Sequence, residues 1–391
     1  MRVAIFTDND FQKVNGVTTT LSAVLRYAPS SMALRVYTAD AVGADRSDYL
    51  AVKSVGFPIP FYKEMRMYIP RLAEYRRRLL ADRIDLIHLT TPGPLGLVAM
   101  RLARSLRLPM VGTFHTDLAA YTRILSGSAA LGSLMREYMR WPYGRCDRVL
   151  VPSEATRQLL IGARGDATRI GIWTRGVNTD AFSPARRDAA LRASWGVSDT
   201  RPAILYVGRV SREKGLDLLP AMQRQLRARG TPHRFVVVGQ GPMLEELRRT
   251  MEDTVFTGTL DRQAITTAFA SADVFLFPSR TDTAGNVVLE AQASGLPVLV
   301  SDAGGPQENM RDGVTGWVVG GVSPEAWVGR MDRLLAEPAL RARMSAEART
   351  YASGRRWETA LEPLYRTYRD VLLARRRDVG TLITMPGGSP A

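Results

Sequence analysis

Two carboxylates, Asp282 and Glu290, stand eight residues apart on either side of what the pattern predicts to be the start of a helix. The apolar run 273–277 before them is rich in aromatic and β-branched residues, which is typical of a buried strand. The apolar residues of 286–294 fit a buried helix. Loops that lead from a strand into a helix often carry binding groups, so both carboxylates are candidates for ligand chemistry.

The backbone N–H groups of Gly285, Asn286 and Val287 are expected to point out of the start of this helix, where the helix dipole favours a phosphate. Because like charges repel, Asp282 and Glu290 are expected to bind hydroxyl groups that flank a diphosphate. Asp282 would face the sugar of a nucleotide-sugar donor, and Glu290 would reach the nucleotide ribose. The alternative is an acidic loop that only complements the dipole, with Glu290 as a solvated helix residue.

One lysine stands out among the basic residues. The chain has four lysines against 49 arginines, an excess that a coding bias toward arginine explains. Lys214 is the only lysine beyond residue 63, and it follows the strand-like run 203–207 where a loop is expected to open a helix. A compact ammonium there can neutralise a phosphate, and Arg209 in the same loop can add a second charge. A surface lysine at a helix start is the alternative.

A glycine and the histidines complete the candidates. Gly16 lies in the loop after the first strand, where the lack of a side chain would let the backbone approach a diphosphate; an ordinary helix turn is the alternative. His115 ends the strand 109–114, a position where α/β folds place ligand-binding groups. His88 ends another strand and either reaches the same site or is packed inside the sheet, whereas His233 is expected in a loop.

Two further patterns bear on cofactors. Gly239-Gln-Gly241 follows a strand but lacks the third glycine of a dinucleotide-binding fingerprint, so nicotinamide binding has weak support. Asp8-Asn-Asp10 matches a metal-binding pattern, but it lies far along the chain from the acidic pair. Because cations and helix N-termini can stabilise a leaving diphosphate without a divalent ion, we predict a metal-independent site that holds no cofactor.

Strand-like runs alternate with amphipathic segments in two series, which predicts an α/β protein with two Rossmann-like domains and parallel sheets. The first series comprises 2–7, 35–39, 84–89, 110–114 and 147–152, and the second comprises 203–208, 234–239, 254–257, 273–277 and 297–301. Residues 176–202 between them have the composition of a linker. Because ligands bind beyond the carboxyl ends of such strands, two facing sheets would enclose a cleft.

Four further segments carry a resemblance to a known family: Val14-Asn-Gly16-Val-Thr, Phe114-His115-Thr-Asp117, Arg175-Gly176-Val-Asn-Thr-Asp-Ala-Phe182-Ser-Pro184 and Gly208-Arg209-Val-Ser-Arg-Glu-Lys214-Gly215. Together with the acidic segment, they resemble the motifs of glycosyltransferase family 4, the retaining, nucleotide-sugar-dependent enzymes of the GT-B fold. The resemblance covers nearly the whole chain. It implies an N-terminal acceptor-binding domain (1–175), completed by a C-terminal helix (358–378), that faces a nucleotide-sugar-binding domain (176–357) across a cleft.

The resemblance also implies roles within the site. His115, with Asp117 beside it, would line the reacting face of the donor sugar, and Gly239 would belong to a turn near the nucleotide base. The implied catalytic residues are His115, Asp117, Arg209, Lys214 and Asp282, and the implied donor-binding residues are Gly16, Arg209, Lys214, Gly239, Gly285, Asn286, Val287 and Glu290. The family pattern has glutamate at both ends of its acidic pair. The aspartate at 282 is therefore a departure, which bears on donor-sugar specificity more than on activity.

The implied reaction is transfer of a hexose with retention, through an oxocarbenium-like state in which the leaving diphosphate accepts the acceptor's proton. The motifs look most like those of lipid-directed α-mannosyltransferases and of sulfoquinovosyl- and glucosyl-diacylglycerol synthases. The first expectation is mannose from GDP-mannose, transferred to a membrane lipid or glycolipid. UDP-glucose or UDP-sulfoquinovose as donor, and a soluble sugar or polysaccharide as acceptor, stay open. A UDP-sugar epimerase of similar shape would act without an acceptor.

The net charge of +15 would suit nucleic acid, an anionic membrane or an acidic substrate. A nucleic-acid binder needs a basic stripe with interleaved aromatic residues, whereas the aromatic residues here follow strand and core patterns, so no nucleic-acid partner is expected. Basic segments such as 71–80 would either dock on an anionic membrane surface or form a solvated helix face.

The cellular location is constrained by cysteine use and hydropathy. The single cysteine, Cys146, excludes internal disulfides and a cysteine-built zinc site, and it fits a reducing compartment. No run approaches the roughly 18 apolar residues of a membrane span, and the strand 3–7 follows Met1 without a signal-peptide pattern. We expect a cytoplasmic enzyme, soluble or peripheral on the inner face of the cell membrane, with a disordered tail at 385–391.

Overall fold

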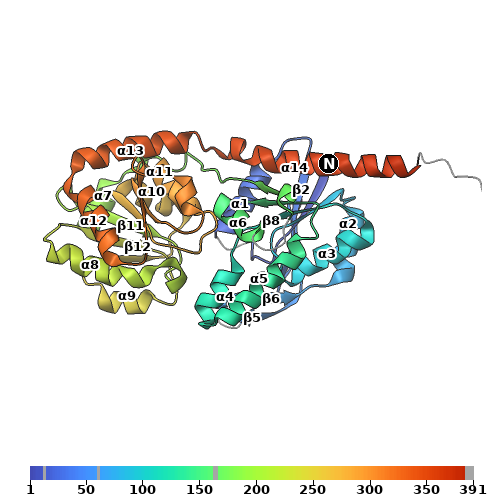
Figure 1. The fold of residues 1–391 in the computed structure, drawn as a ribbon, viewed down its shortest axis with the longest axis horizontal. Helices are drawn as coiled ribbons and strands as arrows, with labels where there is room; N and C mark the ends of the chain where they lie inside the picture. The colour runs from blue at the N-terminus through green and yellow to red at the C-terminus, as the bar shows by residue number, and fades with distance from the viewer. Residues whose placement is uncertain (12–14, 60–61, 162–165, 384–391) are drawn as a thin grey trace, which may run out of the picture.

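The computed structural model describes residues 1–11, 15–59, 62–161 and 166–383, which form two α/β domains set side by side (Figure 1). Each domain is built on its own sheet of mainly parallel strands, flanked by helices. The predicted fold class, two Rossmann-like domains, is thereby confirmed. The predicted disordered tail 385–391 and Val14 of the first motif lie outside the described residues.

The N-terminal sheet has the strand order β10-β9-β8-β7-β1-β2-β4-β3, in which only β3 and β4 pair antiparallel among the described strands. Its strands are β1 (Arg2–Phe6), β2 (Ala33–Asp40), β3 (Ala44–Asp45), β4 (Tyr49–Lys53), β7 (Leu86–Leu89), β8 (Met110–Thr113), β9 (Arg148–Val151) and β10 (Ile170–Ile172). A separate antiparallel hairpin joins β5 (Val55–Ile59) to β6 (Tyr62–Ile69). β7 and β8 are buried along their whole length, because parallel strands are covered on both faces.

The helices of the N-terminal domain are α1 (Gly16–Arg26), α2 (Leu72–Ala81), α3 (Pro94–Leu106), α4 (Leu118–Ser126), α5 (Ala129–Tyr143) and α6 (Glu154–Ile161). Polar side chains in the preceding loops fix several of their starts. The side chain of Asn15 accepts from the backbone N–H groups of Val17 and Thr18 at the start of α1. The hydroxyl of Ser128 accepts from the N–H of Leu131 in α5.

The C-terminal sheet is entirely parallel among its described strands, with the order β13-β12-β11-β14-β15-β16. Its strands are β11 (Ala203–Val207), β12 (Arg234–Val238), β13 (Val255–Gly258), β14 (Val274–Phe277), β15 (Val298–Ser301) and β16 (Gly316–Val319). Its helices are α7 (Ala189–Ser194), α8 (Leu219–Ala228), α9 (Leu244–Thr250), α10 (Arg262–Ser271), α11 (Asn286–Ala293), α12 (Pro324–Ala336) and α13 (Pro338–Ser353). The short 3-10 turns are η1 (Ala167–Arg169), η2 (Pro184–Arg186), η3 (Arg212–Lys214), η4 (Leu216–Leu218) and η5 (Pro306–Asn309).

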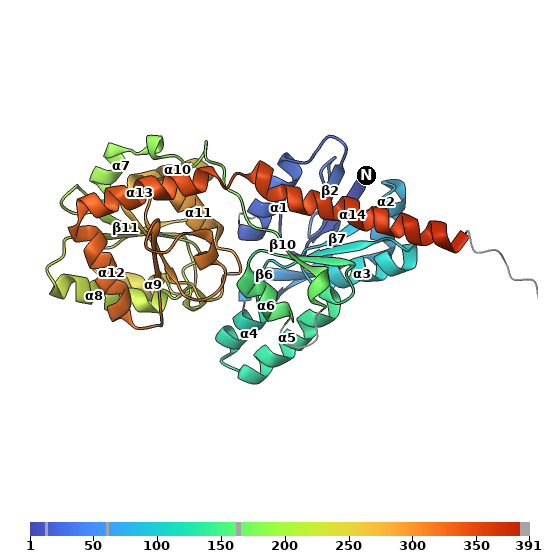
Figure 2. The same ribbon diagram turned by 45° about the horizontal axis from the view of Figure 1, so that its top comes forward.

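The last helix, α14 (Trp357–Ile383), returns to the first domain. Figures 1 and 2 show the chain running from α13 on the C-terminal domain to α14 along the N-terminal domain. Leu361 and Tyr368 of α14 are fully buried in a core that includes Val3 and Ile5 of β1. The hydroxyl of Tyr365 donates to the carbonyl oxygen of Val24 at 2.8 Å, so the helix is also bonded to α1.

All ten predicted strands are present, and the strands that the sequence did not predict lie mostly at the edges of the sheets. β16 contains a glycine and only four residues, and β10 only three. The predicted inner strand β8 also has four residues and a glycine, so length and composition do not separate β16 from it.

Candidate functional site

The order of the C-terminal sheet reverses between β11 and β14, so the loops after these strands lie side by side at its carboxyl edge. Lys214 belongs to the first loop and Asp282 to the second. The Nζ of Lys214 lies 2.9 and 2.8 Å from the two carboxylate oxygens of Asp282. It also donates to the hydroxyl of Tyr121, in α4 of the N-terminal domain, at 3.0 Å. The structure therefore brings the two predicted residues together at the contact between the domains.

Lys214 carries a positive charge at physiological pH. Burial alone would lower its pKa, but the charge of Asp282, with contributions from Tyr121 and Tyr206, raises the pKa well above the ordinary lysine value. The side chains of Lys214 and Asp282 keep 12% and 21% of their surface exposed, so a ligand can reach this ion pair.

Arg209 is held in the same loop by a buried glutamate. Its Nη1 lies 3.1 Å from Oε1 of Glu213, and the hydroxyl of Ser211 donates to the same oxygen at 2.6 Å. The side chain of Glu213 is fully buried, whereas that of Arg209 is 18% exposed. Because the glutamate cannot move freely, it fixes the direction of the guanidinium.

Helix α11 begins after Gly285, whose φ of 71° lies in the left-handed region that favours glycine. No described side chain caps this helix, so the N–H groups of Asn286 and Val287 at its start are available to a ligand by helix geometry. The side chain of Asn286 donates to the carbonyl of Gly16 and the hydroxyl of Thr20 across the domain contact, both at 3.3 Å. A Cβ added to Gly16 would meet no described atom within 4 Å.

Glu290 lies one turn inside α11 and is half-buried. No residue in the described part of the chain donates a hydrogen bond to its carboxylate, which sets it apart from Asp282. Burial raises the pKa of Glu290 to about 7, against a smaller lowering by the charge of Arg262. A half-buried carboxylate with unused acceptor capacity suits a ligand that brings hydroxyl donors.

Gly239 supports the loop that carries Arg209. A Cβ at this position would stand 1.9 Å from the carbonyl oxygen of Gly208, and its φ of 132° also favours glycine. The backbone N–H of Val210 donates to the carbonyl of Gln240 at 2.9 Å, so the two loops run backbone to backbone. This contact gives Gly239 a packing role; its predicted place near the nucleotide base stays a prediction.

The N-terminal domain contributes His115, at the end of β8. The hydroxyl of Thr283, in the acidic loop, donates to the carbonyl oxygen of His115 at 2.6 Å, so His115 lies directly beside that loop. Its ring Nε2 lies 2.8 Å from the hydroxyl oxygen of Thr113, and its Nδ1 lies 3.4 Å from Nη2 of Arg175. Burial, with a contribution from the charge of Arg175, lowers the pKa of His115 well below its usual value, so the ring is neutral.

Two other candidate residues, Asp117 and His88, have positions that the fold itself explains. Asp117 caps α4, since its Oδ1 accepts from the N–H of Ala120 at 3.0 Å. The predicted contact of Asp117 with the donor sugar stays a prediction. His88, for which the sequence allowed two positions, is fully buried within the sheet, so the packed interpretation is the right one.

Three residues of the site, Tyr121, Thr283 and Glu213, were not predicted from the sequence. Tyr121 contacts Lys214 across 93 positions of sequence, and Thr283 contacts His115 across 168. Pairings of this kind follow from the way the domains meet and leave no local pattern. Local signals existed for two of the three, since Thr283 lies inside the acidic motif and Glu213 inside the segment Gly208–Gly215.

The metal-like pattern at Asp8 has a structural explanation. The carboxylate of Asp8 accepts from the N–H groups of Leu95 and Gly96, at 2.8 and 3.3 Å, and from the hydroxyl of Thr91 at 2.8 Å. It therefore binds the start of α3. Within the described ranges, no group of three or more His, Cys, Asp or Glu side chains is placed to hold a metal ion. Metal independence stays a prediction.

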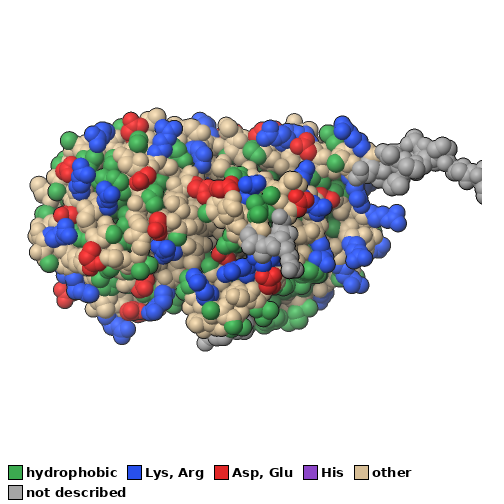
Figure 3. Space-filling model, in the orientation of Figure 1, with side chains coloured by type: hydrophobic (Ala, Val, Ile, Leu, Met, Phe, Trp, Pro, Cys, Tyr) green, Lys and Arg blue, Asp and Glu red, His purple; other side chains and the backbone are tan. Residues whose placement is uncertain are grey.

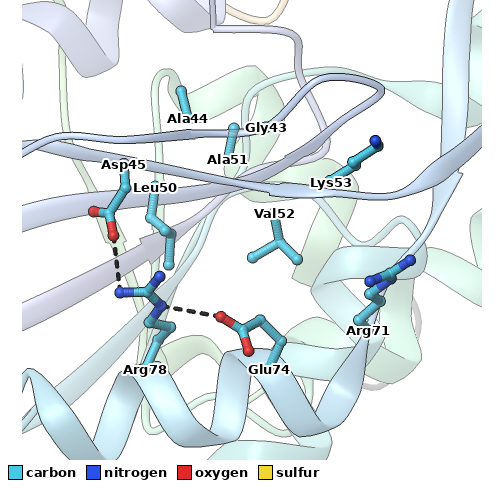
Figure 4. A pocket seen from close by; sticks show the side chains of 10 residues that line it. All are labelled: Gly43, Ala44, Asp45, Leu50, Ala51, Val52, Lys53, Arg71, Glu74 and Arg78. Carbon is cyan, nitrogen blue, oxygen red and sulfur yellow. Dashed lines mark hydrogen bonds and ion pairs between the residues drawn. The ribbon is translucent and has the colours of Figure 1, made fainter.

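A surface hollow of about 340 Å³ lies elsewhere, between β4 and α2. Figure 4 shows Asp45 and Glu74 on either side of Arg78, at 2.8 and 3.0 Å. The hollow is lined by two acidic side chains and three basic ones, the latter being Lys53, Arg71 and Arg78, and none of the predicted site residues lines it. Among the helices of the described chain, none combines the length and apolar character needed to cross a membrane.

The arrangement of the two domains recurs in solved structures. Sucrose-phosphate synthase from Thermosynechococcus elongatus matches with a TM-score of 0.78 at 20% sequence identity, over 95% of this chain and 99% of that one. The fold is GT-B. Within this fold, a cationic loop and a helix N-terminus are brought together at the contact between the domains.

Sequence comparisons identify the family. Residues 14–181 match the model described as Glycosyltransferase Family 4, and residues 188–351 match Glycosyl transferases group 1. A GDP-mannose-dependent alpha-mannosyltransferase from Mycobacterium tuberculosis is 32% identical over 387 residues, covering 95% of this chain and 97% of the relative. Sulfoquinovosyl transferase SQD2 from Arabidopsis thaliana is 29% identical over 369 residues, covering 92% and 71%. The chain belongs to glycosyltransferase family 4.

Proposed function

We propose that this glycosyltransferase moves a hexose, in the first instance mannose from GDP-mannose, to a hydroxyl group of a membrane lipid or glycolipid, with retention at the anomeric carbon. The observation that carries the proposal is the partly buried ion pair of Lys214 and Asp282 where the domains meet, beside the start of α11. A cation, a carboxylate and helix N–H groups suit the phosphates and the hydroxyls of a nucleotide sugar.

The donor is proposed to lie along this row of groups. Its diphosphate would accept hydrogen bonds from the N–H groups at the start of α11. Its negative charge would be stabilised by Lys214 and by Arg209 of the same loop. The carboxylate of Asp282 would then accept hydroxyl groups of the sugar, and Glu290, one turn further, would accept those of the ribose. Each group is thereby matched to a ligand of complementary charge or hydrogen-bonding type.

In the proposed reaction the bond from the anomeric carbon to the diphosphate oxygen breaks, and the acceptor oxygen bonds to that carbon on the same face. The acceptor's proton passes to the departing diphosphate oxygen. Lys214 and Arg209 stabilise the charge that develops on the diphosphate, so we propose that no divalent ion is required. His115 is not the base in this scheme, because its low pKa and its two bonded ring nitrogens leave no site for the proton.

The relatives support the choice of donor. The Mycobacterium tuberculosis relative carries GDP-mannose dependence in its name, and SQD2 carries sulfoquinovosyl transfer, which supports UDP-sulfoquinovose as an alternative. UDP-glucose is a further alternative. The aspartate at position 282 makes the hexose the least constrained part of the proposal, because a shorter carboxylate reaches a different set of hydroxyls.

One face of α5 supports a lipid acceptor. Leu131, Leu134 and Trp141 are 44%, 67% and 46% exposed, and the guanidinium of Arg145 lies 4.4 Å from the centre of the Trp141 ring. Figures 1 and 2 show α4 and α5 together at one extremity of the N-terminal domain. Exposed apolar side chains with arginine beside them suit the interface of an anionic bilayer.

The basic segment 71–80 is a weaker candidate for membrane contact than the sequence indicated. In α2, both Arg77 and Arg78 pair with Glu74, at 2.5 and 3.0 Å. Figure 3 shows basic side chains interspersed with acidic and apolar ones over the visible face, with no single basic stripe there. We therefore place the proposed membrane contact on α5.

The proposal is tested by incubating the purified protein with GDP-mannose, UDP-glucose and UDP-sulfoquinovose, each with and without anionic liposomes that contain diacylglycerol and phosphatidylinositol. Nucleoside diphosphate release is measured, and the product is analysed for its anomeric configuration. We expect release with one donor that rises when lipid is present, and an α-linked product. Release that lipid does not change would contradict the lipid acceptor, and an inverted product would contradict retention.

The membrane contact has its own test. The variant Leu134→Gln is expected to weaken liposome binding about five- to tenfold in a cosedimentation assay, because an exposed leucine no longer enters the bilayer interface. Val322→Gln, which changes a 62% exposed residue of the C-terminal domain, is the matched control. Equal binding by both variants would remove α5 from the proposal.

A further inference from the structure

A continuous chain of hydrogen bonds runs from the acidic loop to the terminal helix through buried side chains. His115 contacts Thr113 at 2.8 Å, and Thr113 contacts Nε2 of His88 at 2.7 Å. Nδ1 of His88 contacts the hydroxyl of Tyr368, in α14, at 2.7 Å. His88, Thr113 and Tyr368 are fully buried. Buried polar networks of this kind specify one arrangement only when every member is bonded.

At one end of this hydrogen-bonded network, Arg175 sets the direction of the bond to His115. A guanidinium only donates, and Nη2 of Arg175 lies 3.4 Å from Nδ1 of His115, so this nitrogen cannot carry a hydrogen. The proton of the neutral ring must then be on Nε2, which donates to the hydroxyl oxygen of Thr113. If the hydroxyl of Thr113 uses both its acceptor and its donor capacity, it donates its own hydrogen to Nε2 of His88.

The remaining bonds follow from the same reasoning. Since Nε2 of His88 accepts from Thr113, the proton of the neutral His88 ring is on Nδ1, which donates to the hydroxyl of Tyr368. Burial lowers the pKa of His88 to about 3, so this ring is neutral across the physiological range. Each histidine is therefore held as a single tautomer, and the two tautomers are different.

One end of this series of hydrogen bonds lies where the two domains meet. The carbonyl oxygen of His115 accepts from the hydroxyl of Thr283, one residue after Asp282. Orientation of the His115 ring and backbone therefore acts on the loop that contributes to the proposed donor site. At the other end, Tyr368 belongs to a helix that reaches this sheet only after the chain has crossed the C-terminal domain.

We propose that Thr113 and His88 are positioning residues which, with Tyr368 of the terminal helix, hold His115 as the Nε2–H tautomer and fix its carbonyl against Thr283. Docking of α14 is thereby linked to the geometry of the acidic loop. The effect on catalysis rests on the proposed function, whereas the assignment of tautomers does not.

The assignment is tested by NMR on the full chain labelled with ¹⁵N-histidine, which has only three histidines to resolve. Long-range proton–nitrogen correlations report which ring nitrogen carries the hydrogen. We expect the Nε2–H form for His115 and the Nδ1–H form for His88, both unchanged between about pH 5.5 and 8. An Nδ1–H form or a titrating ring at His115 would overturn the proposal. His233, whose Nδ1 contacts the carbonyl of Thr231 at 2.7 Å, is the internal reference.

Variants then separate positioning from packing. Thr113→Val keeps the shape but removes the hydroxyl, and we expect kcat to fall about 10- to 100-fold, with the KM for the donor changed by less than about threefold and the His115 signals altered. Thr113→Ser keeps a hydroxyl and is expected to restore both the tautomer and most of kcat. A Thr113→Val variant with normal kcat and unchanged His115 signals would overturn the proposal.

A second variant covers the case in which Thr113→Val does not fold. Tyr368→Phe removes one oxygen at the far end of the chain and leaves Thr113 in place. We expect the Nδ1–H signal of His88 to change while that of His233 does not, and kcat to fall less than in Thr113→Val. If the His88 signals are the same in Tyr368→Phe as in the original protein, the terminal helix plays no part and the proposed link is wrong. Failure of the proposed reaction alone would abolish kcat in all variants but leave the tautomers as assigned.

Discussion

The two domains contribute residues to the candidate site that differ in how many of their hydrogen-bonding groups are already used. On the N-terminal side, both ring nitrogens of His115 are bonded within the protein and its carbonyl accepts from Thr283. On the C-terminal side, Glu290 receives no hydrogen bond from any described residue, and burial raises its pKa to about 7. The hydrogen-bonding groups of His115 on the N-terminal side are therefore already used within the protein. The carboxylate of Glu290 on the C-terminal side can still accept hydrogen bonds from a ligand.

This difference assigns separate tasks to the two domains. A bonded, neutral histidine provides a fixed surface and takes no part in proton transfer. A half-buried carboxylate that receives no hydrogen bonds is destabilised when it is ionised. A ligand whose hydroxyl groups donate to it would stabilise the ionised form. Lys214 lies between the two sides, since it contacts Asp282 of its own domain and Tyr121 of the other.

The largest expected effect comes from removing the cation between the two sides. Lys214→Ala should lower kcat by about 100- to 1,000-fold, because the charge on the leaving diphosphate loses its fixed partner. Arg212→Ala is the matched control, since Arg212 is an exposed cation in the same turn. Steady-state kinetics with the donor identified by the release assay measures both. A Lys214→Ala variant as active as Arg212→Ala would show that this charge is not part of the mechanism.

The next effect sharpens the description of Glu290. Glu290→Gln should raise the KM for the donor by about 10- to 100-fold, because hydrogen bonds to a charged acceptor are lost, while kcat changes much less. Glu347→Gln changes an exposed glutamate of α13 and is the control. An unchanged KM in Glu290→Gln would mean that the free carboxylate does not meet the donor.

The free energy of unfolding, measured without any substrate, should also depend on the raised pKa of Glu290. Its folded-state pKa of about 7 lies above the ordinary value of 4.5, so the folded chain binds more protons than the unfolded chain between these two values. The contribution of this group to the free energy of unfolding is therefore present at pH 4.5 and is lost as the pH rises through 7. Thermal melts should show Glu290→Gln gaining stability relative to the original protein from pH 5 to 8. A constant difference over this range would contradict the raised pKa.

The smallest effect concerns the contact between the sides. Tyr121→Phe removes the hydroxyl that accepts from Lys214 across the domain contact. We expect kcat/KM to fall by less than about tenfold, because Asp282 still holds the ammonium. Tyr138→Phe is not a suitable control, since Tyr138 bonds to the carbonyl of Pro92, so the comparison is with the original protein. A loss as large as that of Lys214→Ala would mean that Tyr121 of the N-terminal domain, and not Asp282, mainly positions the Lys214 ammonium.

The sequence predicted what is local. Strands β11 and β14 of the C-terminal sheet are continuous apolar runs, and Lys214, Asp282 and the start of α11 lie in the segments that follow them. The reversal of strand order between β11 and β14 then brings these loops together, as the general behaviour of parallel sheets implies.

The rest depended on contacts between distant segments. Neither Tyr121 nor Thr283 has a pattern of its own, because each acts on a residue of the other domain. The sequence favoured a packed strand position for His88 only slightly over a ligand site, because its partner Tyr368 lies 280 positions further along. The edge strand β10 has only three residues, whereas β16 has the length and glycine content of the predicted strand β8, so its local composition does not explain the difference.

The most direct test of the account is the affinity for the donor, measured by isothermal titration calorimetry at pH 6 and pH 8. The phosphates of a nucleotide sugar are diesters that do not titrate in this range, and Glu290 passes from mostly protonated to mostly ionised. The account predicts that the original protein binds the donor roughly tenfold more tightly at pH 8, whereas Glu290→Gln binds weakly and equally at both values. Equal affinity of the original protein at the two pH values, or tight binding by Glu290→Gln, would contradict it.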